Sequence, residues 1–360
     1  MKGIFLQAEG QPAAYRTDLP EPTIRAGGVV LRMLSVPVLS YTRDVFSGSL
    51  KYLMPVPFVP GNSGVGVIEQ VASDVVHLKV GQRVSVDPRL APHNAADTPE
   101  ANSILIGLTA STPTSQKLQQ IWKDGSYAEK ALVPAECVTP LDALSQFSPE
   151  RLSLLSHLAI PYGGLLRGEL RPSQTVVING ATGSFGARAV LVALALGAAR
   201  VVAVGRDQAT LASLVALDPK RVVPATLQKG DVAKSAEAIS AAAGGTGADL
   251  YFDMLGRAQD PDSILACLQS LRHRGTAVFM GGVRIPIPIE YAKVMTSELT
   301  IRGNFMYPRT AVADLVNLVS AGLLDLNKVP LRTFPLDQFE AACDQAERSK
   351  ALEAVSVVIA

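Results

Sequence analysis

Cysteine, excess charge of one sign and long hydrophobic runs are all scarce in this sequence of 360 residues. The three cysteines, Cys137, Cys267 and Cys343, are far apart and odd in number, which predicts a reducing compartment and not a disulfide framework. Lysine and arginine number 33 and aspartate and glutamate 32, so the formal net charge is +1. This balance gives no electrostatic reason to expect a nucleic acid or an acidic partner.

The most apolar run, Ala187 to Leu196, is too short to span a bilayer and is flanked by Arg188 and Arg200. The first ten residues contain glutamate and glycine too early for a signal peptide. We therefore expect a cytoplasmic protein without a membrane partner.

The length of the chain and a change in its pattern predict two domains. Up to about residue 140 we expect short strands and turns, with strands at 29–36, 64–71, 80–86 and 126–133 and a long loop at 88–117. From Ser148, the expected cap of a helix with Pro149 in its first position, strands and helices alternate. This alternation predicts an α/β fold with a doubly wound parallel sheet, with strands at 175–179, 201–205, 221–223, 248–254 and 276–281.

After about residue 305 the alternation ends. Helices are expected at 311–321 and 337–348 and a strand at 355–359. We expect this tail to return to the first domain, which would comprise residues 1–150 and 309–360, with residues 151–308 forming the second.

Residues 176–186, VVINGATGSFG, predict a strand, a glycine turn and a helix start. Ala181, Gly183 and Gly186 occupy the three small-residue positions of a G-x-G-x-x-G fingerprint, with alanine in place of the first glycine. Such a turn lets the backbone approach a pyrophosphate and directs the positive end of a helix at it. A glycine turn without a ligand is the alternative. We predict a dinucleotide site that includes Ala181, Thr182, Gly183, Ser184, Phe185 and Gly186.

The end of the next strand, Gly205-Arg206-Asp207, indicates which dinucleotide is bound. NAD-binding folds usually place an acidic residue there for the ribose 2′-hydroxyl. Gly205 removes side-chain bulk where a 2′-phosphate would lie, and Arg206 offers it a bidentate cation. Asp207 is expected to cap the following helix. The pattern favours NADP(H), although Arg206 could also be a solvated surface charge.

Several anchors together resemble the medium-chain dehydrogenase/reductase superfamily, which includes zinc alcohol dehydrogenases and quinone oxidoreductases. They are residues 59–66 (VPGNSGVG), 78–84 (LKVGQRV), 124–129 (DGSYAE), the glycine fingerprint, 252–256 (FDMLG), 280–282 (MGG) and 297–303 (SELTIRG). The resemblance implies a GroES-like, mainly β catalytic domain and a Rossmann dinucleotide-binding domain, with the active site in the cleft between them.

The departures from that family concern zinc. Tyr41 and Asn62 stand where zinc-containing members have a ligand cysteine and a ligand histidine, and the third ligand position falls near Ser156 and His157. The region corresponding to the lobe of the structural zinc, residues 88–123, has no cysteine. Because zinc needs three or four donor side chains, we predict neither a catalytic nor a structural zinc. The histidines are scattered, at His77, His93, His157 and His273.

Without a metal, the substrate oxygen needs a hydrogen-bond donor when it becomes negative. The resemblance places Tyr41 opposite the nicotinamide, so its phenol is the first candidate, although it could simply be a packing tyrosine. Asn62, next to Ser63, could bind a carbonyl oxygen or satisfy backbone groups. Tyr52 lies in a loop that resembles the segment of quinone oxidoreductases whose tyrosine reaches the cleft. His157 is expected to be a buried core histidine and not a proton donor.

Further cofactor contacts follow from positions that match the family. The ends of the fourth and fifth strands of the parallel sheet are expected to line the cofactor groove, and residues 304–305 to lie close by. These positions are Leu255, Gly256, Gly281, Gly282, Val283, Asn304 and Phe305.

Two functions remain open. The first is a zinc-independent, NADPH-dependent oxidoreductase that transfers hydride to a small carbonyl, enone or quinone substrate. The second is a non-catalytic dinucleotide-binding protein with a decayed active site. A homodimer is expected in either case, because family members often pair the last strand of the Rossmann sheet, here near residues 300–303, across a two-fold axis.

Overall fold

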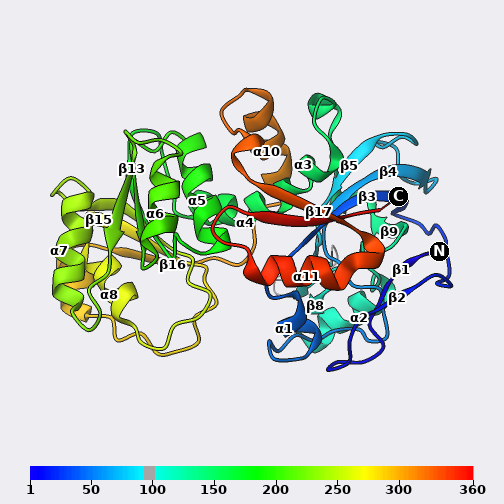
Figure 1. Ribbon diagram of the computed structural model, residues 1–360, viewed down its shortest axis with the longest axis horizontal. Coiled ribbons are helices and arrows are strands. Elements are labelled where there is room, and N and C mark those ends of the chain that lie inside the picture. Colours follow the sequence, from blue (N-terminus) through cyan, green and yellow to red (C-terminus); the bar gives the residue numbers. More distant parts are fainter. Residues whose placement is uncertain (93–101, 360) are drawn as a thin grey trace. The chain divides into compact units, whose positions relative to one another are not determined.

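The computed structural model describes residues 1–92 and 102–359, which divide into two compact units (Figure 1). Unit 1 comprises Met1–Ser156, Val329–Ser349 and Ala354–Ala360, and unit 2 comprises His157–Lys328 and Lys350–Glu353. Among the described residues, no helix is long and apolar enough to cross a membrane.

Unit 1 is built on a mostly antiparallel sheet around the long strand β3 (Gly28–Val38), nearly all of which is buried. The order is β10-β5-β4-β3-β18-β17, with β9 also paired to β3. The other strands are β4 (Gly64–Val71), β5 (Arg83–Val86), β9 (Lys130–Pro134), β10 (Val138–Pro140), β17 (Leu331–Pro335) and β18 (Ala354–Val358), beside a hairpin of β1 (Gly3–Phe5) and β2 (Ala14–Arg16). The helices α1 (Thr42–Phe46), α3 (Pro149–Leu152) and α11 (Phe339–Arg348) also belong to this unit.

The expected strand at 126–133 begins four residues later in the structure. The backbone N–H groups of Ser126 and Tyr127 donate to the carbonyls of Gly61 and Pro60 at 2.9 and 3.0 Å, so these residues pair with a loop before β9 begins. Helix α3 starts as expected, with the Ser148 hydroxyl accepting from the N–H of Arg151 and Pro149 in the first turn.

The expectation of a long loop at 88–117 is wrong where the structure describes it. Short strands β6 (Arg89–Leu90), β7 (Ile104–Leu105) and β8 (Thr109–Ala110) pair antiparallel, and helix α2 (Pro113–Ile121) follows. Thr112 and Ser115 form a reciprocal capping box, and Pro113 occupies the first turn. These residues were a helix-start signal that the sequence reasoning passed over.

Unit 2 contains a wholly parallel sheet of order β13-β12-β11-β14-β15-β16. This is the doubly wound arrangement that the sequence predicts. Its strands are β11 (Thr175–Asn179), β12 (Arg200–Gly205), β13 (Val222–Thr226), β14 (Ala248–Asp253), β15 (Leu271–Phe279) and β16 (Thr300–Gly303). Its helices are α4 (Leu154–Arg167, whose first turn lies in unit 1), α5 (Ser184–Ala195), α6 (Gln208–Val215), α7 (Val232–Ala242), α8 (Asp262–Gln269), α9 (Tyr291–Thr296) and α10 (Ala311–Ser320).

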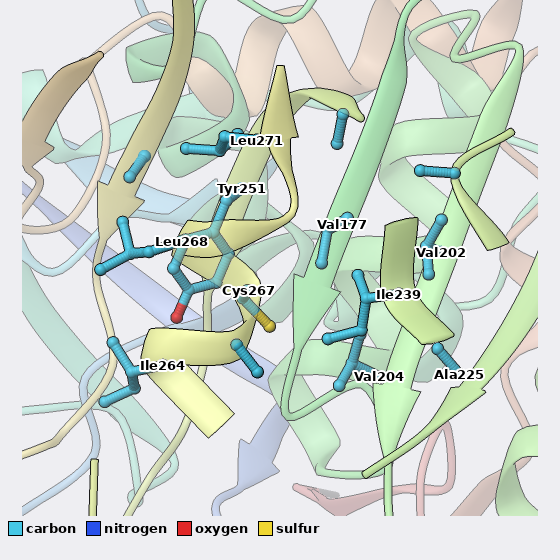
Figure 2. Close-up of a cluster of buried hydrophobic side chains, with 14 residues drawn as sticks. Val177, Val202, Val204, Ala225, Ile239, Tyr251, Ile264, Cys267, Leu268 and Leu271 are labelled. Atoms are coloured by element: carbon cyan, nitrogen blue, oxygen red, sulfur yellow. The ribbon is translucent and has the colours of Figure 1, made fainter. Parts of the chain in front are cut away.

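Apolar side chains from the strands and helices of unit 2 form a buried core on one side of this sheet. Figure 2 shows Val177 and Val202 of β11 and β12 near Ile239 of α7, with Cys267 of α8 and Tyr251 of β14 beside them.

The expected second-domain boundary at residue 308 differs from the compact unit, which continues through α10 to Lys328. The amphipathic helix α10 buries Val312, Leu315 and Val316 and belongs to unit 2 and not to the returning tail.

A polar network is enclosed where β11 and β14 end. The Asn179 amide donates to Oδ1 of Asp253 at 3.1 Å, and the Tyr251 hydroxyl donates to the same oxygen at 3.0 Å. Asp253 is only 3% exposed, and this burial raises the pKa of its carboxyl to about 6, although the bonds from Tyr251 and Asn179 act in the opposite direction. The ionised carboxylate is therefore less favourable in the folded protein than in the unfolded chain.

Asp253 should make the stability of unit 2 fall as the pH rises. Because its folded pKa exceeds its unfolded value, the contribution is complete below about pH 4 and lost as the pH passes 6, up to about 3 kcal/mol. Asp253→Asn cannot ionise, so the difference in the free energy of unfolding between pH 4 and pH 7 should change by that amount. Urea unfolding of both proteins across this range measures it, and parallel pH profiles would contradict the assignment.

Candidate functional site

The predicted dinucleotide turn lies between β11 and α5 and is shaped by close backbone contacts. Gly180 adopts a left-handed φ of +75°, and Gly183 precedes the helix without a side-chain cap. A Cβ on Gly186 would overlap the carbonyl oxygen of Gly180, so only glycine lets α5 start this close to the strand. The first N–H groups of α5 have no partner within the helix, and the exposed Gly183 leaves them accessible.

Gly205, where β12 ends, faces the same turn. Ala181 is fully buried, and its N–H donates to the carbonyl of Val204 at 3.0 Å. A Cβ on Gly205 would overlap the methyl group of Thr182. The absence of a side chain at 205 thus has a packing cause besides the expected room for a 2′-phosphate.

The two residues after Gly205 differ in their contacts. Asp207 is the N-cap of α6, and its Oδ1 accepts from the N–H of Thr210 at 2.8 Å, which confirms the expected cap. The pKa of Asp207 is held below its ordinary value first by the hydrogen bonds from Thr210 and further by the charge of Lys350. Arg206 and Lys350 are both exposed. The segment after β12 therefore exposes the basic side chain of Arg206, with Lys350 near Asp207, while the acidic side chain of Asp207 caps α6.

The predicted positions after β14 and β15 also come together. A Cβ on Gly281 would overlap the carbonyl oxygen of Leu255, and the N–H of Gly282 donates to that oxygen at 2.7 Å. Gly256, Gly281 and Gly282 are exposed, whereas the side chains of Leu255 and Val283 pack against the core of Figure 2. At these last two positions the side chains are thus partly taken up by core packing.

Asn304 and Phe305 follow the edge strand β16. The N–H of Asn304 donates to the carbonyl of Phe279 at 3.0 Å, and its amide donates to the carbonyl of Met306 at 2.8 Å. Phe305 is 65% exposed. Parallel strands share one carboxyl edge, so all the predicted cofactor positions of unit 2 lie at or beside that edge. Their contacts with a dinucleotide stay predictions.

Two of the catalytic candidates lie close together in unit 1. Tyr41 directly precedes α1, and its phenol is near enough to Tyr52 for the two to interact electrostatically. Burial raises the pKa of Tyr41 well above its ordinary value, and the neighbouring Tyr52 raises it further. Tyr41 is therefore a neutral hydrogen-bond donor at any ordinary pH.

Asn62 is positioned by a crossing of glycine backbones. The N–H of Gly61 donates to the carbonyl of Gly107 at 3.0 Å, and a Cβ on Gly125 would overlap the carbonyl oxygen of Gly61. The Ser63 hydroxyl donates to Oδ1 of Asn62 at 3.4 Å. Asn62 is half-buried, so its amide keeps polar atoms for another group.

Metal ligands are not assembled in the part of the chain that the structure describes, where no group of three or more His, Cys, Asp or Glu side chains could hold an ion. His93 lies outside the described residues. His157 packs edge-on against the Phe185 ring, with centroids 5.8 Å apart, and burial together with the Arg188 charge lowers its pKa to about 3. It is a neutral core histidine.

The sequence reasoning missed Arg188, which it treated only as a charge limiting an apolar run. This residue is 1% exposed, and its guanidinium bonds the Ser184 hydroxyl and carbonyl at the start of α5. The available signal was an arginine inside a helix that is otherwise almost wholly apolar.

Comparisons with known proteins agree with the two-part architecture. Residues 25–143 match the alcohol dehydrogenase GroES-like domain, and residues 185–321 match the zinc-binding dehydrogenase domain. A putative D-xylulose reductase from Agrobacterium fabrum is 25% identical over 360 residues, covering 97% of each chain.

Two solved structures share the fold over nearly the full length of both chains. A short chain alcohol dehydrogenase from E. coli CFT073, complexed with NADH, has a TM-score of 0.81 at 20% identity, covering 99% of each chain. A putative zinc-binding dehydrogenase from Sinorhizobium meliloti 1021, bound to NADP, has a TM-score of 0.79 at 21% identity, covering 99% of this chain and 98% of the other.

Proposed function

This chain is an oxidoreductase of the medium-chain dehydrogenase/reductase superfamily, and we propose that it is a zinc-independent member that uses NADPH to reduce a carbonyl, enone or quinone. The observation that carries the proposal is the turn before α5. Its uncapped helix N-terminus and the close Gly186–Gly180 packing fit a diphosphate. When bound, the nicotinamide supplies the hydride.

The chemistry of unit 1 supports the absence of a metal from the reaction. Tyrosine and asparagine at positions 41 and 62 are poor substitutes for the thiolate and imidazole that zinc takes. The Tyr41 phenol stays neutral because its pKa is raised, so it can donate a hydrogen bond to an oxygen that gains negative charge. The Asn62 amide, oriented by Ser63, is proposed to position the substrate oxygen.

Hydride transfer decides between this function and a non-catalytic dinucleotide-binding protein. Stopped-flow oxidation of NADPH against a panel of enones, quinones and aldehydes should reveal turnover, with elemental analysis of the same sample giving zinc far below one atom per chain. Dinucleotide binding without oxidation by any panel member would favour the non-catalytic alternative. Stoichiometric zinc that resists dialysis, together with activity lost on chelation, would contradict the metal-free proposal.

The basic strand end predicts a preference for NADPH over NADH. Arg206→Ala should weaken NADPH binding by roughly 1.5–3 kcal/mol and leave NADH binding nearly unchanged, because only NADPH carries the 2′-phosphate. Calorimetric titration with both cofactors measures this. Lys220→Ala, which removes another exposed charge of unit 2, is the control and should change neither affinity. Equal affinities of the wild-type protein for the two cofactors would refute the preference.

Tyr41 is expected to act in the chemical step. Tyr41→Phe keeps the ring but removes the donor, so the single-turnover rate of hydride transfer should fall about 10²-fold or more while NADPH affinity is nearly unchanged. Tyr52→Phe is the matched comparison, because the two phenols are neighbours. A wild-type rate in Tyr41→Phe with a large loss in Tyr52→Phe would transfer the role to Tyr52.

A homodimer formed through β16 is also proposed. This strand lies at the edge of the sheet and contains the exposed Ile301 (37%), and helix α9, which precedes it in the chain, carries the exposed Tyr291 (81%) and Met295 (58%). Pairing with a second copy would cover both the edge and these side chains. Light scattering at micromolar concentration should give a dimer mass for the wild type and for the control Val76→Lys, and a monomer mass for Ile301→Lys. A wild-type monomer would rule out this assembly.

A further inference from the structure

Arg188 is a buried positive charge that pairs with no acidic side chain in the part of the chain that the structure describes. Its Nη atoms donate to the carbonyl and hydroxyl of Ser184 and to the carbonyl of Glu353, while its Nε has no partner. Desolvation lowers its pKa to about 10, and no acidic side chain acts against this effect. The acceptors bonded to its Nη atoms are all neutral, so they leave its charge uncompensated.

The position of this charge on α5 makes it more unfavourable. The side chain of Arg188 points back one turn, as long helical side chains do, and reaches Ser184 in the first position of the helix. The N-terminus of a helix already carries partial positive charge, and cations there are destabilising. Burial, the helix dipole and the lack of a counter-ion therefore all oppose the charged form of Arg188.

An anion at the start of α5 would supply the missing counter-ion and interact favourably with the helix dipole, and so would offset the cost of burying the charge. His157, whose pKa is lowered by burial and by the Arg188 charge, is neutral and cannot compensate that charge. The first turn of α5 has no acidic residue. We propose that Arg188 is a positioning residue whose buried charge is neutralised by the diphosphate of the bound dinucleotide, and that it orients the Ser184 hydroxyl toward that diphosphate. This inference rests on the proposed dinucleotide site and adds a residue to it.

A purely structural role is the competing explanation, because the bond to the Glu353 carbonyl also ties the segment Lys350–Glu353 to α5. The two roles differ in what happens without ligand. Replacing an uncompensated buried charge by an apolar side chain of similar length should not destabilise the empty protein, whereas loss of an anchor should.

The decisive variants are Arg188→Met, which removes the charge, and Arg188→Lys, which keeps it. A matched control lies at the other end of the same helix, where Arg221 bonds the carbonyls of Leu194 and Ala198 and pairs with Asp218. Arg221→Met should lower thermal stability but leave ligand affinity unchanged. Arg188→Gln serves as a second neutral variant if the methionine variant does not fold.

Calorimetric titration with NADPH, NADH, ADP-ribose and adenosine separates the diphosphate from the rest of the ligand. Arg188→Met should weaken the first three by the same factor, roughly tenfold or more, and leave adenosine binding unchanged. Arg188→Lys should stay within about threefold of the wild type. The melting temperature of ligand-free Arg188→Met should equal or exceed that of the wild type, while its rise on adding ADP-ribose shrinks.

Two outcomes would overturn the inference about Arg188 and leave the proposed dinucleotide site intact. One is wild-type affinity for ADP-ribose in the neutral variants, and the other is an equal loss of affinity in Arg188→Met and Arg188→Lys. A lower melting temperature of ligand-free Arg188→Met with unchanged affinity would assign Arg188 the anchoring role instead. Failure of the wild-type protein to bind any of the three diphosphate ligands would refute the dinucleotide site itself, and is thereby distinguished from a failure of Arg188.

Discussion

The close approach of Gly186 to the carbonyl oxygen of Gly180 is the constraint on which the site of unit 2 depends. Because no side chain separates them, α5 begins directly at the end of β11, with its first N–H groups at the carboxyl edge of the sheet. The loop before the helix lies against the ends of β12 and β14, through the bond from the Ala181 N–H to the Val204 carbonyl and the packing of Gly180 against Met254. The proposed cofactor positions are thus arranged by backbone packing before any side chain contributes.

Close packing of glycine backbones also positions a candidate residue in unit 1. The backbones of Gly61, Gly107 and Gly125 cross at distances that exclude a Cβ, and Asn62 directly follows this crossing. Buried polar side chains also form hydrogen bonds in each unit. In unit 2, Asn179, Tyr251 and Asp253 share hydrogen bonds beneath the strand ends, and in unit 1 the Ser126 hydroxyl donates to the carbonyl of Ser63 at 2.6 Å. Close backbone crossings beside hydrogen-bonded polar side chains are what a preorganised site requires.

Local signals in the sequence were sufficient for most of the fold. The bounds of β4 and β11 and the caps at Ser148 and Asp207 follow from apolar runs and capping residues. The lobe of β6, β7 and β8 could not be found this way, because strands of two residues show no periodicity and are defined only by long-range pairing. The burial of Arg188 and the network at Asp253 likewise depend on which distant segments pack together. Such tertiary contacts lie outside what the spacing of residue types can indicate.

The overlap between a side chain at position 205 and the methyl group of Thr182 couples substitutions at these two positions. An acidic side chain at 205 would need the space that the Thr182 methyl group occupies, so it requires that Thr182 shift or be replaced. Asp207 cannot supply the acid in its place while it caps α6. Substitution at position 182 before position 205 therefore avoids the overlap, whereas the opposite order passes through a poorly packed intermediate.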